Sequence, residues 1–259
     1  MNMPPAEPPP LLSCAECVRG AGLGFDFTMA FQPIIDLETS QVFAQEALVR
    51  GLNQEPASYI LSQINPENRY RFDQACRAKA IQLAAHLPIG SAYLSINFLP
   101  NAIYRPETCI RATLEAAKTY HFPQNQIMFE FTEGERIENH QHLIGIIREY
   151  QRLGFKTAID DFGAGYAGLN LLAEFQPDII KLDMALTRHI NQDKVRRSIV
   201  LGILSVSREL NCEVIAEGIE TYEELMTLRE AGIHLFQGYY FARPTFEGFA
   251  DLHFSPALN

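Results

Sequence analysis

The sequence predicts an α/β protein whose strands close into a TIM-like (β/α)8 barrel. Three observations support this fold class. Eight strand-like runs follow one another along the chain, helical segments separate most of the last six, and the runs are nearly continuous in apolar residues. Such runs are typical of strands that helices cover on both faces of the sheet. An open, doubly wound sheet is the alternative, but eight strands in 259 residues fit a closed barrel better.

The first two strands are expected at residues 27–36 (FTMAFQPIID) and 42–51 (VFAQEALVRG). Only the segment LETSQ joins them. A connection this short suits an antiparallel pair, because parallel neighbours need a long crossover. A helical stretch follows at residues 68–87.

After this helix, strands and helices alternate. The remaining strands are expected at residues 92–98, 127–133, 156–162, 178–183, 213–218 and 235–241. The helices among them are expected at residues 106–120, 139–152, 167–174, 193–210 and 221–232. Residues 1–26 begin with the proline-rich segment MNMPPAEPPP and are expected to form a partly disordered extension, so that 27–259 form the barrel domain.

Composition and charge exclude several classes of function. The chain carries 21 Lys and Arg against 31 Asp and Glu, so it lacks the basic surface that a binder of long nucleic acid needs. No apolar run reaches the length of a membrane-spanning helix, and the N-terminus lacks the pattern of a secretory signal. We therefore expect a cytoplasmic protein without a membrane partner, whose five cysteines are reduced.

Two cysteines of the extension, Cys14 and Cys17, have the spacing of half a zinc site. The chain has no second CxxC and no clustered histidines, so a closed zinc site within one chain is not expected. Free thiols are the favoured interpretation, and a four-sulfur site shared between two copies is the alternative.

Polar residues gather where the strands end. The candidates are Glu46, Asn97, Glu130, Glu133, Asp160, Asp161, Lys181, Asp183, Glu217 and Gln237. Any one of them alone is more simply a helix cap or a surface ion pair. That explanation fails for the whole set, because the C-terminal ends of the parallel strands of a barrel meet at one rim, where active sites are built.

So many carboxylates at one rim need cations, because like charges repel one another or raise each other's pKa. The ligands are all oxygen donors, which favours Mg²⁺ or Mn²⁺ over zinc. Asp160 and Asp161 could bridge two metal ions, as in sites that displace a leaving oxygen at phosphorus. Lys181 would add a fixed charge beside the developing oxyanion or hold the attacking water.

These segments resemble a known family. QEALVR (45–50) contains the Glu-Ala-Leu signature of the EAL domains, which hydrolyse the bacterial second messenger cyclic di-GMP. The resemblance continues in order through FQPIID, SINF, FEFTE, IDDFGAGYAGL, IIKLD, VIAEGIET and FQGYYFARP, and it covers residues 27–246. The tripeptide alone would carry no weight, but the ordered set of motifs is highly specific. It implies a barrel whose first strand runs antiparallel to the rest.

The resemblance also implies roles for individual residues. The implied metal ligands are Glu46, Asn97, Glu130, Asp160, Asp161 and Glu217, with Asp160 shared between two ions. The implied catalytic residues are Glu217 as general base or holder of the water, Lys181 steadying that water, and Gln237 supporting the site. Gln32 and Arg50 resemble contacts to guanine and phosphate, while Glu133 and Glu220 resemble residues that support the loops and the metals.

Two segments depart from the family pattern. The loop after the fifth strand usually carries Thr and Ser-Ser where this chain has Ala164 and Ala167-Gly168, which bears on metal affinity and regulation. The segment NRYRFDQACR also differs. Within it, Asp73 is a candidate contact to guanine or ribose, and an Arg-rich helix face is the alternative.

The function implied is metal-dependent hydrolysis of cyclic di-GMP to linear pGpG. One alternative is a catalytically weak cyclic di-GMP receptor or a protein-interaction module, and another is a different metal-dependent hydrolase on the same barrel. We also expect a homodimer and allow for a regulatory protein partner.

Overall fold

The computed structural model describes residues 22–103, 109–132, 140–165 and 168–252. The two extension cysteines, Cys14 and Cys17, and the loop residue Glu133 lie outside the described residues. The expected disorder of the extension therefore stays a prediction. No helix of the described part is both long and apolar enough to cross a membrane.

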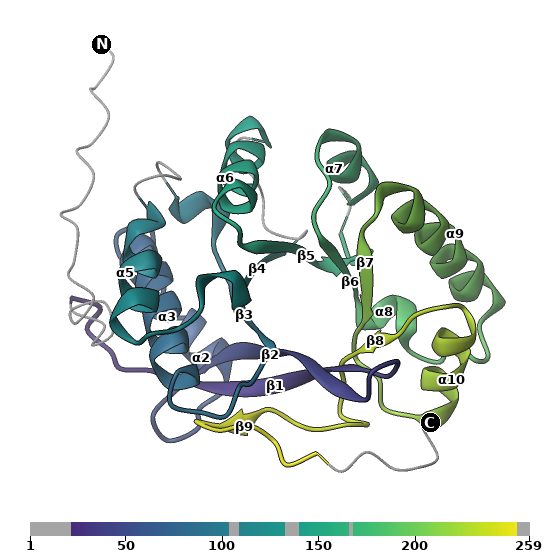
Figure 1. Cartoon of the computed structure of the whole chain (residues 1–259), viewed down its shortest axis with the longest axis horizontal. Helices are drawn as coiled ribbons and strands as arrows, with labels where there is room; N and C mark the ends of the chain where they lie inside the picture. The colour runs from purple at the N-terminus through teal and green to yellow at the C-terminus, as the bar shows by residue number, and fades with distance from the viewer. Residues whose placement is uncertain (1–21, 104–108, 133–139, 166–167, 253–259) are drawn as a thin grey trace.

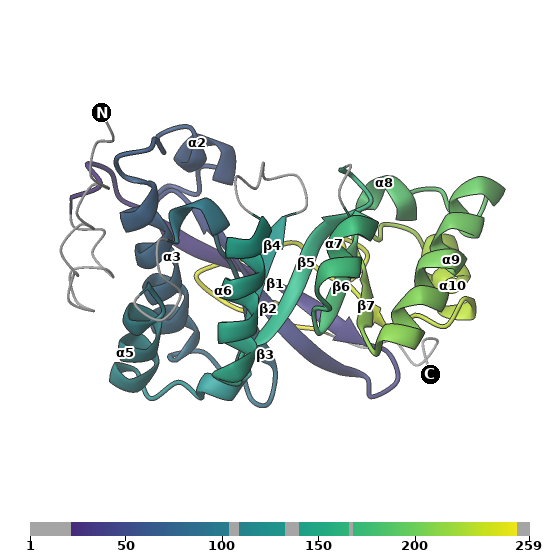
Figure 2. The same cartoon turned by 90° about the horizontal axis from the view of Figure 1, so that it is seen from above.

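The strands close into a barrel, as the sequence predicts (Figures 1 and 2). They are β1 (Thr28–Asp36), β2 (Gln41–Arg50), β3 (Tyr93–Asn97), β4 (Ile127–Thr132), β5 (Lys156–Phe162), β6 (Ile179–Leu182), β7 (Glu213–Ala216), β8 (Leu235–Phe236) and β9 (Thr245–Phe246). Neighbours from β2 to β8 pair in parallel. β1 pairs antiparallel with both β2 and β8 and so closes the ring. The antiparallel first strand is thus confirmed.

Helices cover the outside of this ring. They are α2 (Ala57–Leu61), α3 (Arg69–Ala84), α5 (Arg111–Thr119), α6 (His140–Arg152), α7 (Gly168–Glu174), α8 (Met184–Thr187), α9 (Lys194–Leu210) and α10 (Tyr222–Glu230), with short 3-10 turns η1 (Pro100–Ala102) and η2 (Gln124–Gln126). Figures 1 and 2 both place α3 and α5 on one side of the strands and α9 and α10 on the opposite side.

Capping residues explain where several helices begin. Asp193 accepts hydrogen bonds from the backbone N–H groups of Val195 and Arg196 at the start of α9. Thr221 and Glu224 form a reciprocal capping box at the start of α10. Asp183, expected as the last residue of the sixth strand, instead caps α8 by accepting a hydrogen bond from Ala185 N.

The expected strand at residues 235–241 is mostly wrong. Only Leu235 and Phe236 pair as a strand, and Gln237 is the first residue beyond β8. The apolar run continues, but the backbone turns at Gly238, where a Cβ atom would lie 2.1 Å from Ile219 O. The chain then returns as β9, which pairs with β1 and was not expected from the sequence.

Candidate active site

Two layers of side chains fill the inside of the barrel. The lower layer is apolar and consists of Ile34, Ala44, Met128, Ala158, Ile179, Ile215 and Leu235. The upper layer is polar and consists of Gln32, Glu46, Glu130, Asp160, Lys181, Glu217 and Gln237. Each polar residue lies two positions from an apolar one on the same segment, and alternate residues of a strand face the same side. The polar side chains therefore gather at one mouth of the barrel, and the apolar layer fills the barrel below them.

Asp160 and Asp161 both contribute to this mouth, although neighbours along a strand normally face opposite sides. The register between β5 and β6 shifts between Ile159 and Phe162, and Asp161 has a left-handed φ of 54°. This local irregularity re-aims one side chain, as bulges do in sheets. Carboxylate oxygens of Asp160, Asp161 and Glu217 lie within 4.8 Å of one another.

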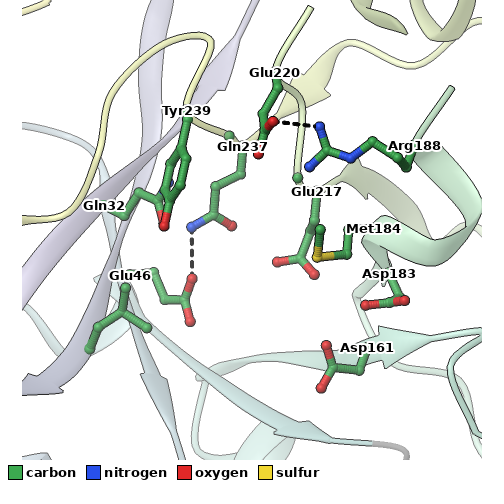
Figure 3. Close-up of a pocket in the computed structure, with 13 residues that line it drawn as sticks. Gln32, Glu46, Asp161, Asp183, Met184, Arg188, Glu217, Glu220, Gln237 and Tyr239 are labelled. Carbon is green, nitrogen blue, oxygen red and sulfur yellow. Dashed lines mark hydrogen bonds and ion pairs between the residues drawn. The ribbon is translucent and has the colours of Figure 1, made fainter. Parts of the chain in front are cut away.

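A second oxygen cluster joins Asp160 to the other side of the mouth. Carboxylate oxygens of Glu46, Glu130 and Asp160 also lie within 4.8 Å of one another. Two amides orient Glu46: Asn97 Nδ2 donates to Oε1 at 3.0 Å, and Gln237 Nε2 donates to Oε2 at 2.7 Å. The second of these hydrogen bonds is visible in Figure 3. Asp160 therefore belongs to both clusters.

The ammonium of Lys181 lies among these acids. Its Nζ is 2.8 Å from Glu130 Oε2, 2.9 Å from Asp160 Oδ1, 2.8 Å from Glu217 Oε1 and 3.6 Å from Glu46 Oε2. Burial disfavours the charged ammonium, but the surrounding carboxylates outweigh this effect and hold the pKa of Lys181 well above its ordinary value. Lys181 is therefore protonated at neutral pH.

One ammonium does not neutralise this many carboxylates. Burial, opposed by Lys181, raises the pKa of Glu130 to about 8, and burial together with Asp160 raises the pKa of Asp161 to about 6. Burial likewise raises the pKa of Glu217 well above its ordinary value. The fully buried Oε1 of Glu130 has no hydrogen-bond partner among the described residues. Oxygen donors that favour protonation or lack a partner fit hard divalent cations such as Mg²⁺ and Mn²⁺.

A cavity of about 260 Å³ opens above the clusters, and Figure 3 shows the residues that line it. Gln32, Glu46, Asp161, Glu217 and Gln237 all contribute to its walls, so the structure brings these expected site residues together. Gln32, the candidate contact to guanine, therefore lines the same cavity as four residues expected at the metal and catalytic site.

Other expected residues lie outside the two oxygen clusters. Glu220 lies at the rim of the cavity and pairs with Arg188 at 2.8 Å. Arg50 does not line the cavity, and its Nη1 donates to Val49 O at 2.7 Å. Ala164 closes a turn by donating its N–H to Asp161 O, while Ala167 lies outside the described residues.

Asp73 lines a second cavity, of about 310 Å³, which lies next to the first and shares Leu48 with it. Asp73 is 2% exposed and forms an ion pair with Arg77 at 2.8 Å. Its Oδ1 accepts a hydrogen bond from Leu99 N at 2.9 Å. Both carboxylate oxygens therefore already have protein partners.

Sequence reasoning missed several residues of the mouth. Met184, Arg188 and Tyr239 are among the missed residues that line the first cavity. The Arg243 guanidinium lies 4.1 Å from the centre of the Tyr239 ring. Tyr239 directly follows Gln237 and Gly238, just after β8. The expected strand at residues 235–241 gave no reason to place Tyr239 in the mouth, whereas a turn predicted at Gly238 would have done so. Arg188 gave no such signal, because its partner Glu220 is distant in sequence.

The sequence matches the family model of the EAL domain over residues 21–244. The chain therefore belongs to the EAL domain family. A crystal structure of a standalone versatile EAL protein from Vibrio cholerae O395, in its c-di-GMP-bound form, is 56% identical, with a TM-score of 0.86 and coverage of 89% of this chain and 97% of that one.

Two relatives from Escherichia coli (strain K12) illustrate the range of the family. The blue light- and temperature-regulated antirepressor BluF is 34% identical over 223 residues, which cover 86% of this chain and 55% of BluF. The cyclic di-GMP phosphodiesterase PdeR is 38% identical over 138 residues, which cover 53% of this chain and 21% of PdeR. This chain therefore spans little more than half the length of BluF and a smaller share of PdeR.

Proposed function

We propose that this protein hydrolyses one phosphodiester bond of cyclic di-GMP and releases linear pGpG, with two divalent ions, Mg²⁺ or Mn²⁺, as cofactors. The observation that carries the proposal is the place of Asp160 in both oxygen clusters. A carboxylate shared by two adjacent metal sites is typical of phosphodiester displacement. The c-di-GMP complex of the Vibrio cholerae protein and the activity named for PdeR support the substrate and the reaction.

The described side chains supply the ligands for both ions. The proposed ligands are Glu46, Asn97, Glu130 and Asp160 for one ion, and Asp160, Asp161 and Glu217 for the other. When bound, the ions supply positive charge to the scissile phosphate and lower the pKa of a bound water. Gln237 and Asn97 keep Glu46 in its orientation through their hydrogen bonds.

Lys181 and Glu217 act together on the attacking water in this proposal. Their 2.8 Å contact fixes the carboxylate, and Lys181 can donate a further N–H to the water oxygen. Glu217 would accept one proton of the water as the water oxygen attacks phosphorus, the P–O3′ bond in line with it would break, and the departing 3′-oxygen would take up a proton from solvent. The Lys181 charge then offsets charge that develops on the phosphoryl oxygens.

The remaining expected residues are proposed to hold the substrate or the loops. Gln32, which lines the cavity, and Arg50 are proposed contacts to guanine and phosphate. Asp73 lines the second cavity, so a guanine or ribose would have to contact it there. Its two oxygens already contact Arg77 and the N–H of Leu99. Glu220 supports the rim through Arg188, and Glu133 is proposed to anchor the loop after β5.

Product analysis tests the proposal directly. Purified protein incubated with cyclic di-GMP and Mn²⁺ should form pGpG, and Glu46→Ala should lose this activity while it stays folded. A generic phosphodiester should turn over much more slowly than cyclic di-GMP. If the wild type binds cyclic di-GMP without forming pGpG, the enzymatic function is wrong.

A second candidate function is a receptor or protein-interaction module without efficient catalysis. The similarity to BluF, which is named an antirepressor, is the observation that favours it. The joint presence of Glu46, Asp160, Lys181 and Glu217 in one cluster favours the enzyme instead. The product assay separates the two functions.

We further propose a homodimer in the cytoplasm, with control by a regulatory protein partner. Leu169 on α7 is 65% exposed, which supports a contact between copies at this helix. The described cysteines Cys76, Cys109 and Cys212 are free and buried, which agrees with a reducing compartment. Light scattering on the purified protein tests the dimer.

A further inference from the structure

An arginine without contact to water lies directly behind the proposed metal site. Arg77, on α3, has 0% of its surface exposed. Three aromatic rings surround its guanidinium, whose carbon lies 5.0 Å from the centre of Phe129, 5.5 Å from Phe98 and 5.7 Å from Tyr150. A planar cation suits such an enclosure, because it is attracted to aromatic faces and still donates hydrogen bonds at its edge.

The edge of this guanidinium connects two helices and a loop. Its Nη2 pairs with Asp73 at 2.8 Å, and its Nη1 donates to the hydroxyl of Tyr150, on α6, at 2.7 Å. Asp73 in turn accepts the N–H of Leu99, two residues after the end of β3. Burial raises the pKa of Asp73, and the positive charge of Arg77 opposes this effect.

Two of the enclosing rings are sequence neighbours of proposed metal ligands. Phe98 follows Asn97, and Phe129 precedes Glu130. Asn97 and Glu130 are register partners on β3 and β4, and Phe98 N donates to Glu130 O at 2.9 Å. Because adjacent residues of a strand face opposite sides, packing behind the strands fixes the orientation of the ligands in front of them.

We propose that Arg77, held by Asp73 and Tyr150, is a positioning residue that fixes the ends of β3 and β4 so that Asn97 and Glu130 present their oxygens to a divalent ion. This inference rests on the proposed metal site. A well-packed apolar side chain would fill the same space at lower cost, because a buried ion pair often stabilises no more than its hydrophobic replacement. In this proposal, the buried charge of Arg77 serves to orient the ends of β3 and β4.

The test is the affinity of the metal-free protein for Mn²⁺, measured by titration calorimetry. Arg77→Met keeps much of the volume but removes the charge, the ion pair with Asp73 and the hydrogen bond to Tyr150. Loss of residues that orient metal ligands typically weakens metal binding about 10- to 100-fold, and we expect this range for Arg77→Met. Tyr150→Phe removes one hydrogen bond and should weaken binding several-fold. With saturating Mn²⁺ and cyclic di-GMP, kcat should largely recover in both variants, because neither residue touches the substrate.

Leu204→Ala serves as a matched control, because it removes a buried side chain from α9 on the opposite side of the barrel. It should lose stability and keep its Mn²⁺ affinity. Unchanged affinity in Arg77→Met, or an equal loss in Leu204→Ala, overturns the inference. If Arg77→Met does not fold, Tyr150→Phe decides by the same comparison. A wild type that binds Mn²⁺ but forms no pGpG would contradict the proposed function and leave this test intact.

Discussion

Lys181 Nζ lies 2.8 Å from Glu217 Oε1, so the cation of the site and its proposed base hold each other in place. The same ammonium contacts Glu130 and Asp160 at nearly equal distances. Lys181 therefore links the two oxygen clusters across the barrel. The four carboxylates around it hold the pKa of Lys181 well above its ordinary value, although burial opposes this effect.

Replacing Lys181 with Met should lower kcat about 100- to 1,000-fold, because the water loses a donor and the phosphoryl oxygens lose a fixed charge. Binding of Mn²⁺ should persist in this variant, since the carboxylates no longer share their charge with an ammonium. Calorimetry with Mn²⁺ and a pGpG assay measure the two effects separately. Lys156→Met is the control, because Lys156 pairs with Asp178 and lines neither cluster. A fully active Lys181→Met would refute the proposed role.

Metal affinity should rise with pH. Burial raises the pKa of Glu130 to about 8 and that of Asp161 to about 6, and both must lose a proton to bind a divalent ion. Apparent Mn²⁺ affinity should therefore increase from pH 6 to about pH 8 and then level off. Calorimetry in two buffers of different ionisation enthalpy should detect proton release. A flat profile would contradict these assignments.

The stability of the metal-free protein should change in the opposite direction. The pKa of Glu130 rises from 4.5 to about 8 on folding, so the folded state binds more protons than the unfolded chain between these values. The free energy of unfolding should then fall as pH rises through this window, and Mn²⁺ should restore it. Thermal unfolding with and without Mn²⁺ at pH 5 and pH 8 measures the difference.

Asp161→Asn should leave one of the two metal sites intact. Asparagine tolerates the left-handed φ of 54° at this position, so the turn should persist while the charge is lost. Asp160 still serves the cluster with Glu46 and Glu130. We therefore expect one tightly bound Mn²⁺ per chain instead of two, with most activity lost. Metal analysis after dialysis gives the ratio, and a ratio of two would show that Asp161 is not a ligand.

The sequence predicted the barrel and its mouth because both depend on local patterns. An apolar residue followed two positions later by a polar one, as in Ile179 and Lys181, predicts a strand whose end lies at the mouth of the barrel. The pairing of Asp73 with Arg77 was less visible. Four positions apart on a helix, the two residues look like an exposed ion pair, and only the packing of three aromatic rings around Arg77 shows that they are buried.

The end of β8 was missed for a physical reason that a substitution can test. Gly238 lies so close to the loop after β7 that a Cβ atom would be 2.1 Å from Ile219 O and 2.3 Å from Ile219 N. Gly238→Ala should push the backbone away and destabilise the fold by about 1–3 kcal/mol. Gln237 would move with it and release Glu46, so activity should fall further than stability alone explains.

Gly202→Ala is the matched control for this substitution. Gly202 lies on α9, and a Cβ atom there would meet open space. Alanine in a helix interior is favoured over glycine by roughly 0.5–1 kcal/mol, so this variant should be slightly more stable and fully active. Urea unfolding and the pGpG assay compare the two variants. If Gly238→Ala were as stable as the wild type, the backbone contact with Ile219 could not be what turns the chain out of the barrel.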